Sequence, residues 1–70
     1  MNRYLVTIRD VDSMVERKVE VQSETAQGAH KKAMFEELAS FETEQVVQIT
    51  NTKNKVVFNE EGFIDYQGDI

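Results

Sequence analysis

The stretch VEVQSETAQGAHKKA (residues 19–33) decides the fold, because its hydrophobic period changes from two to helical spacing within a few residues. Val19 and Val21 alternate with polar side chains, which is typical of a strand with one solvent-facing side. From Ala26 onward, small apolar residues recur every three or four positions, which predicts a helix with one buried stripe. A strand that leads directly into such a helix favours a helix packed across the strand's own sheet.

The predicted helix runs from Glu24 to about Ala39, with Ser23 as its N-cap. A serine hydroxyl accepts a hydrogen bond from an otherwise unpaired amide in the first turn, and a glutamate there suits the helix dipole. Gly28 costs about 1 kcal/mol relative to alanine inside a helix, and we expect close backbone approach to explain it. The predicted buried stripe consists of Ala26, Ala29, Ala33, Met34 and Leu38.

Four segments around this helix have the composition of β-strands. They are Arg3–Arg9, Val15–Gln22, Gln45–Thr50 and Lys55–Asn59. Turn-forming residues 10–13 join the first two into a hairpin. Phe63, Ile64 and Tyr66 either add a short fifth strand or cover a sheet edge. The sequence therefore predicts a single α+β domain over residues 1–70, with one antiparallel sheet of four or five strands, one helix on one face, and the order ββαββ(β).

The residue types needed for most catalytic and metal chemistry are missing or badly spaced. Cysteine is absent, which excludes disulfides and thiolate metal sites. His30 is the only histidine, so a zinc site lacks its ligand cluster, and we expect His30 to pack against the rim of the sheet. The adjacent pairs Glu36-Glu37 and Glu60-Glu61 do not point at a common substrate, and the three glycines form no phosphate-binding loop. We expect neither catalysis nor a cofactor.

Charge is distributed unevenly along the chain. The formal net charge is −5, and residues 36–70 hold two basic against eight acidic side chains. Such a segment repels phosphate-rich ligands. It is either a solvated surface that aids solubility or an acidic face that meets a basic, nucleic-acid-binding partner.

A group of carboxylates lies around the end of the predicted helix, where the negative end of the helix dipole makes them mildly unfavourable. Either these residues have drifted on a solvated surface, or they dock on a basic patch and raise the association rate and specificity. Phe35 lies opposite the buried stripe. It is either a contact anchor or partly buried with Phe41. The predicted partner-binding residues are Phe35, Glu36, Glu37, Glu42 and Glu44.

Nucleic-acid binding is the alternative hypothesis. Its candidate residues are Arg17, Lys18, Lys31 and Lys32. These basic residues are few, acidic residues lie close to each, and the aromatic, glycine-rich basic strand of RNA-binding sheets is missing. Direct nucleic-acid binding is therefore the weaker hypothesis. A third hypothesis is self-association through exposed sheet edges, so the expected state is a monomer or a homodimer.

The chain resembles small phage-encoded accessory proteins, in particular compact anti-CRISPR proteins of similar length. The resemblance rests on Val19-Glu20-Val21-Gln22-Ser23 followed by Ala26, Ala29 and Ala33, within a strand–strand–helix–strand–strand order. The opening strand Tyr4 to Arg9 and the closing hairpin Val46 to Phe58 also match that layout. Those proteins place basic residues at their interface, whereas residues 36–70 are acidic here, so no functional residue is carried over.

The resemblance implies an inhibitor or adaptor that occupies the surface of a host protein. Together with the missing catalytic groups, it predicts a non-catalytic protein–protein interaction module that modulates a host nucleic-acid machine. The N-terminal residues contain no long apolar run. We therefore expect no membrane association and a cytoplasmic location, which is the host cytoplasm if a phage encodes the protein.

Overall fold

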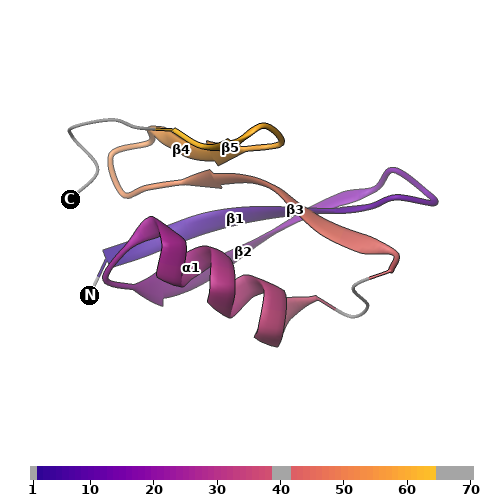
Figure 1. Cartoon of the computed structure of the whole chain (residues 1–70), viewed down its shortest axis with the longest axis horizontal. Helices are drawn as coiled ribbons and strands as arrows, with labels where there is room; N and C mark the ends of the chain where they lie inside the picture. The colour runs from indigo at the N-terminus through magenta and orange to yellow at the C-terminus, as the bar shows by residue number, and fades with distance from the viewer. Residues whose placement is uncertain (1, 39–41, 65–70) are drawn as a thin grey trace.

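Five strands and one helical segment form the part of the chain that the structure, a computed structural model, describes: residues 2–38 and 42–64. The elements are β1 (Asn2–Asp10), β2 (Glu16–Ser23), α1 (Ala26–Lys32), a π-helical turn η1 (Ala33–Glu37), β3 (Glu44–Thr50), β4 (Val56–Asn59) and β5 (Gly62–Phe63). Every strand pair is antiparallel, and the order across the sheet is β2-β1-β3-β4-β5 (Figure 1). The predicted α+β fold with the order ββαββ(β) is confirmed. The fifth strand is the pair Gly62–Phe63, whereas Tyr66 lies outside the described residues.

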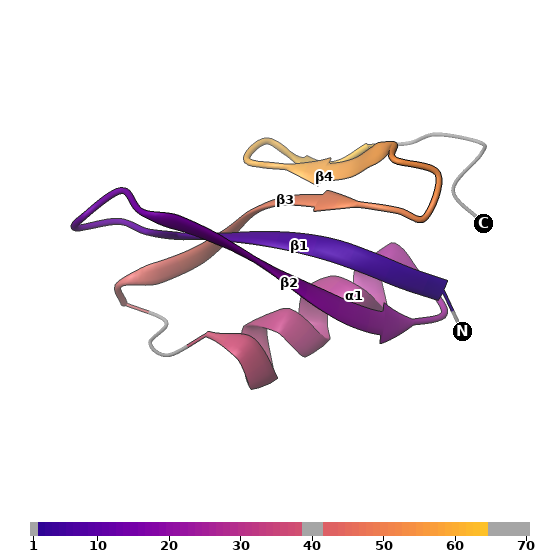
Figure 2. The ribbon, with the colours of Figure 1, turned by 180° about the vertical axis from the view of Figure 1, so that it is seen from behind.

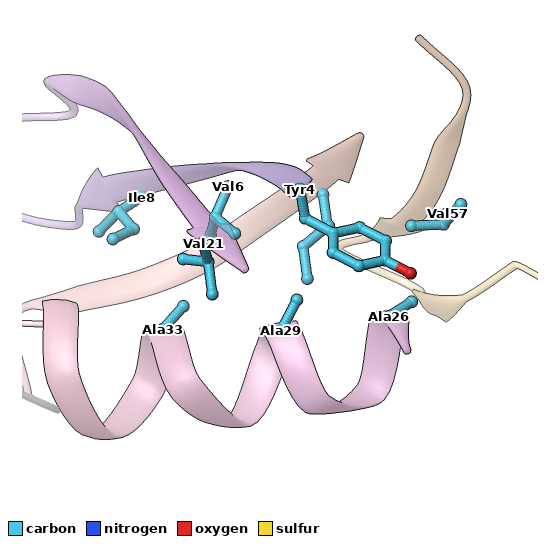
Figure 3. Packing of buried hydrophobic residues seen from close by; sticks show 9 residues of the cluster. Tyr4, Val6, Ile8, Val21, Ala26, Ala29, Ala33 and Val57 are labelled. Carbon is cyan, nitrogen blue, oxygen red and sulfur yellow. The ribbon is translucent and has the colours of Figure 1, made fainter. Parts of the chain in front are cut away.

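The core lies between the helix and one face of the sheet. Three alanines of the predicted stripe, Ala26, Ala29 and Ala33, are buried beneath larger side chains of the strands (Figure 3). Those larger side chains are Tyr4, Val6, Ile8, Val21, Ile49 and Val57. Because alanine adds only a methyl group, the helix axis lies close to the sheet. The predicted stripe is confirmed at these three positions, and Met34 is only half-buried.

The helix begins later than the sequence predicts. Thr25 is the N-cap, and its side chain accepts a hydrogen bond from the backbone N–H of Gly28 at 3.0 Å. Ser23 pairs with Asn2 as the last residue of β2, so its backbone belongs to the sheet. Its buried hydroxyl accepts from the Thr25 N–H at 3.4 Å. The prediction of Ser23 as N-cap was wrong, because the strand continues through it.

Gly28 allows this junction to close. A Cβ added at Gly28 would lie 2.3 Å from Ser23 Oγ and 3.2 Å from Thr25 Oγ1. A close approach explains this glycine, but the expectation that backbone makes it was wrong, because the nearest atoms belong to the side chains of Ser23 and Thr25.

The helix ends in a wider turn than an α-helix has. The N–H of Leu38 donates to the carbonyl of Ala33 at 3.2 Å, five residues back, and Leu38 itself is extended. A π-type turn holds more residues than an α turn, so Leu38 returns to the core side, where it packs against the buried cluster. The predicted end at Ala39 lies outside the described residues.

No helix formed by residues 2–38 or 42–64 covers the other face of the sheet (Figure 2). Alternate residues of β1 and β2 therefore remain in contact with solvent, among them Leu5, Lys18 and Glu20. Register shifts between Thr7 and Ile8 and between Ile49 and Thr50 interrupt the pairing of β3 with its two neighbours. No described helix has the length and apolar character that a membrane crossing requires.

Candidate protein-binding surface

The β1–β2 turn and the segment that leads into β3 lie at one end of the molecule, and η1 contacts β3 (Figure 1). The N–H of Val11 in the turn donates to the carbonyl of Thr43 at 2.7 Å. Asp10 pairs with Glu44 in the sheet. The turn is thereby fixed beside the segment that follows the helix.

The predicted contact residues of η1 face away from the core. Phe35 is 71% exposed, and Glu36 is exposed beside it, whereas Glu37 is half-buried. Glu42, just before β3, is also exposed. Phe41, the predicted packing partner of Phe35, lies outside the described residues, so the choice between the two interpretations stays open.

Glu44 is engaged within the protein. Arg17 Nη2 donates to Glu44 Oε1 at 3.2 Å and to the backbone carbonyl of Glu37 at 2.6 Å (Glu44 side chain 13% exposed). A cation at the last carbonyls of a helix offsets the negative end of its dipole. Arg17, predicted for nucleic acid, and Glu44, predicted for a partner, therefore bind each other and join β2, η1 and β3.

The four basic residues of the alternative hypothesis are not gathered into one patch. Arg17 lies on the helix side of β2, and Lys18 points to the opposite face because side chains alternate along a strand. Lys32 Nζ donates to the carbonyl of Gln22 at 2.8 Å. Lys31 is exposed on the helix. This arrangement does not provide the continuous basic surface that nucleic-acid binding requires.

The β1–β2 turn adds exposed apolar residues that the sequence analysis did not single out. Val11, Met14 and Val15 are 40%, 61% and 64% exposed. Met14 has a φ of 63°, a left-handed conformation that is uncommon for a residue with a side chain. The only sequence signal for this site was the presence of apolar side chains inside a turn.

A hydrogen-bonded carboxylate gives this turn a defined shape. Asp10 Oδ1 accepts from the N–H groups of Asp12 and Ser13 at 2.9 and 3.1 Å. These bonds lower the pKa of the Asp10 carboxyl from its usual value, because they stabilise its charged form. We use the name acidic end for the exposed or half-buried residues that the turn, η1 and the segment before β3 contribute, namely Val11, Asp12, Met14, Val15, Phe35, Glu36, Glu37 and Glu42.

His30 lies elsewhere and has a packing role. Its ring centroid is 4.6 Å from that of Phe58 and 5.4 Å from that of Phe63, which joins α1 to β4 and β5. Burial lowers the pKa of His30 because it disfavours the charged imidazolium. The predicted contact with the sheet rim is confirmed. Among residues 2–38 and 42–64, no group of three or more His, Asp or Glu side chains is arranged to hold a metal ion.

A shallow polar hollow of about 250 Å³ lies on the open face of the sheet. Its charged lining includes Arg9, whose guanidinium contacts Glu16 and Glu60 at 2.8 Å each. These charges neutralise one another inside the protein, so the hollow is a weaker candidate than the acidic end. No known family model matches the chain, and neither the curated proteins nor the solved structures include a significant match to it.

Proposed function

We propose that the chain is a non-catalytic protein-binding module that uses the acidic end to bind a basic protein. The observation that carries the proposal is that the turn, η1 and the segment before β3 all expose side chains, apolar ones on the turn and η1 and carboxylates on all three. Met14, Val15 and Phe35 are each more than 60% exposed there. Truncation studies of interfaces attribute most binding energy to a few large side chains, whereas surrounding charges contribute association rate and orientation.

The partner we propose carries a basic rim around an apolar depression. The acidic half of the sequence supports this choice, because residues 36–70 hold two basic against eight acidic side chains. Nucleic-acid-binding proteins present such basic surfaces. A phage-type inhibitor or adaptor of a host nucleic-acid machine is the biological role that we propose for this surface. Glu44 supports the site through Arg17 and makes no direct contact in this proposal.

The test is an affinity capture from bacterial lysate that compares matched charge reversals. The double variant Glu36→Lys and Glu42→Lys changes exposed residues of the acidic end. The control, Glu24→Lys and Glu61→Lys, makes the same change in net charge at exposed residues outside it. We expect the first variant to lose a protein that the wild type and the control both retain, because only it removes the local complementarity.

Phe35→Ala separates the apolar from the electrostatic part of the proposal. We expect a loss of affinity that persists at high salt, since apolar contacts are not screened. Equal loss in the two double variants would show a general charge effect and contradict the site. Capture of nucleic acid at low salt in place of a protein would favour the alternative hypothesis.

A further inference from the structure

Strand β2 is a long, regular edge of the sheet. It pairs with β1 from Asn2↔Ser23 to Arg9↔Glu16 without a register shift. Within residues 2–38 and 42–64, no strand pairs with its other side. The opposite edge is β5, which has only two residues. An unpaired edge of this length is a template for another strand unless something prevents it.

The register shows which backbone groups of β2 face outward. The N–H of Asp10 donates to the carbonyl of Val15, and hydrogen-bonded pairs recur at every second residue of an antiparallel ladder. The odd-numbered residues of β2 therefore direct their backbone groups at β1. The carbonyl of Gln22 accepts from Lys32, a residue outside the sheet, which agrees with this alternation. The outward-facing residues are Glu16, Lys18, Glu20 and Gln22.

We propose that this edge binds the same edge of a second copy of the chain, antiparallel, about a two-fold axis at Val19. Lys18 then lies opposite the partner's Glu20, and Glu20 lies opposite the partner's Lys18. Opposite charges on directly opposed residues stabilise a strand pair, whereas like charges destabilise it. In the two neighbouring symmetric registers, Lys18 faces the partner's Lys18, or Glu20 faces the partner's Glu20. The charge sequence of β2 therefore favours this register over its two symmetric neighbours. Lys18 also faces the partner's Glu16 when the axis lies at Arg17, but only three residues of each β2 strand then overlap.

The surroundings of the edge are compatible with this pairing. Glu20 lies 3.8 Å from Arg3 Nη1, but its side chain is 56% exposed and remains accessible to the partner's Lys18. Arg17 is bonded to Glu37 and Glu44 on the helix side. Because Lys32 Nζ already donates to the carbonyl of Gln22, that carbonyl has less capacity to accept a bond from a second strand. The proposed pairing is therefore centred on Lys18 and Glu20. Charged side chains usually protect an edge from unspecific pairing. Here the same charges repel in the neighbouring symmetric registers and attract in this one. The pairing uses no residue of the acidic end, so it stands independently of the proposed function.

Sedimentation velocity from micromolar to millimolar concentration tests the proposal with charge reversals at exposed residues. We expect the wild type to dimerise, and Lys18→Glu and Glu20→Lys to weaken the dimer roughly tenfold or more, because each places two like-charged pairs across the interface. The double variant Lys18→Glu/Glu20→Lys restores both attractions and should dimerise like the wild type. An equimolar mixture of the two single variants should form a heterodimer, since both facing pairs are then opposite in charge.

Lys31→Glu makes the same charge change on the helix and should leave the dimer intact. Far-UV circular dichroism checks that each variant is folded. A wild type that remains monomeric throughout the concentration range would overturn the proposal, even if the edge binds an extended segment of another protein. Single variants that dimerise as the wild type does, or a double variant that stays monomeric, would overturn it as well.

Discussion

At Gly28, one side-chain atom decides the effect of a substitution. Alanine is favoured over glycine in a helix by about 1 kcal/mol. A Cβ at this position, however, would lie 2.3 Å from the buried Ser23 Oγ, which must then move and lose its hydrogen bond from Thr25. We expect Gly28→Ala to lower the free energy of unfolding by about 1 kcal/mol, because overpacking costs more than the helix propensity gains. Chemical denaturation of the purified protein measures this change.

The same substitution in a Ser23→Ala background provides the control. Without the hydroxyl, the nearest Ser23 atom is its Cβ, at the ordinary contact distance of 3.5 Å. Gly28→Ala should then be neutral or stabilising, so the double-mutant cycle has a coupling term. Destabilisation of the same size in both backgrounds would contradict a collision with the hydroxyl.

The N-cap illustrates the limit of the sequence at this scale. Ser23 and Thr25 are both suitable cap residues two positions apart, and propensity alone does not separate them. Which of the two residues caps the helix depends on where β2 ends. That end is set by the pairing of Ser23 with Asn2, the first residue of β1. That pairing is a tertiary contact. A close contact at Gly28, in contrast, could be predicted, because glycine is unfavourable inside a helix. The sequence did not show that side chains, and not backbone, make that contact.

At the scale of elements, Arg17 joins β2, the end of the helix and the start of β3. We expect Arg17→Ala to lower the free energy of unfolding by about 1 to 2 kcal/mol, since it removes a charge-assisted hydrogen bond to a helix-end carbonyl as well as a partly exposed ion pair. Thermal unfolding of the wild type, Arg17→Ala and Arg17→Lys measures the loss. Lysine has a single ammonium group and should recover only part of it.

Glu36→Gln is the matched control for this experiment, because its exposed side chain lies on the same turn. It should leave stability within about 0.5 kcal/mol of the wild type. If Arg17→Ala were equally harmless, Arg17 would not join the three elements as we describe.

The strands and the helix could be predicted from the spacing of apolar residues in the sequence. Alternation predicted β1 and β2, and the spacing of Ala26, Ala29 and Ala33 predicted the helix. The π turn did not follow, although its signal is visible: the core residues Ala33 and Leu38 are five positions apart. A five-residue spacing is also expected where a helix has already ended. Only the packing of Leu38 against the sheet distinguishes a π turn from such an end.

At the scale of the whole molecule, His30 makes stability depend on pH through the contact of α1 with β4 and β5. Burial lowers its pKa in the folded state, whereas the unfolded chain retains a value near 6.5. As pH falls below about 6.5, the unfolded state therefore takes up the proton first. Stability should fall until the pH reaches the lower folded pKa, and this group adds no further loss below that point.

Chemical denaturation at several pH values between 7.5 and 5.5 measures this dependence. His30→Phe retains an aromatic ring that does not titrate, so its stability should vary less with pH over that range. Carboxylates change their charge mainly at lower pH. An equal pH dependence in the wild type and in His30→Phe would show that another group is responsible.

The acidic end shows what a sequence leaves undetermined at this scale. Glu36 and Glu42 were predicted as contact residues from their charge and their position around the end of the helix. Val11 and Met14 were not, because they join the surface only through the bond from Val11 to Thr43. The order of the strands was equally undetermined, since a strand after the helix can pair at either edge of the first hairpin.

A helix on only one face of the sheet divides the residues of β1 and β2 into two sets with different evolutionary constraints. Tyr4, Val6 and Ile8 pack against α1, and any change there alters the core. Lys18 and Glu20 face solvent, so substitutions at such positions alter surface charge with little effect on packing. A lineage of this protein can therefore acquire new binding specificity by substitutions at every second residue while it retains the same fold.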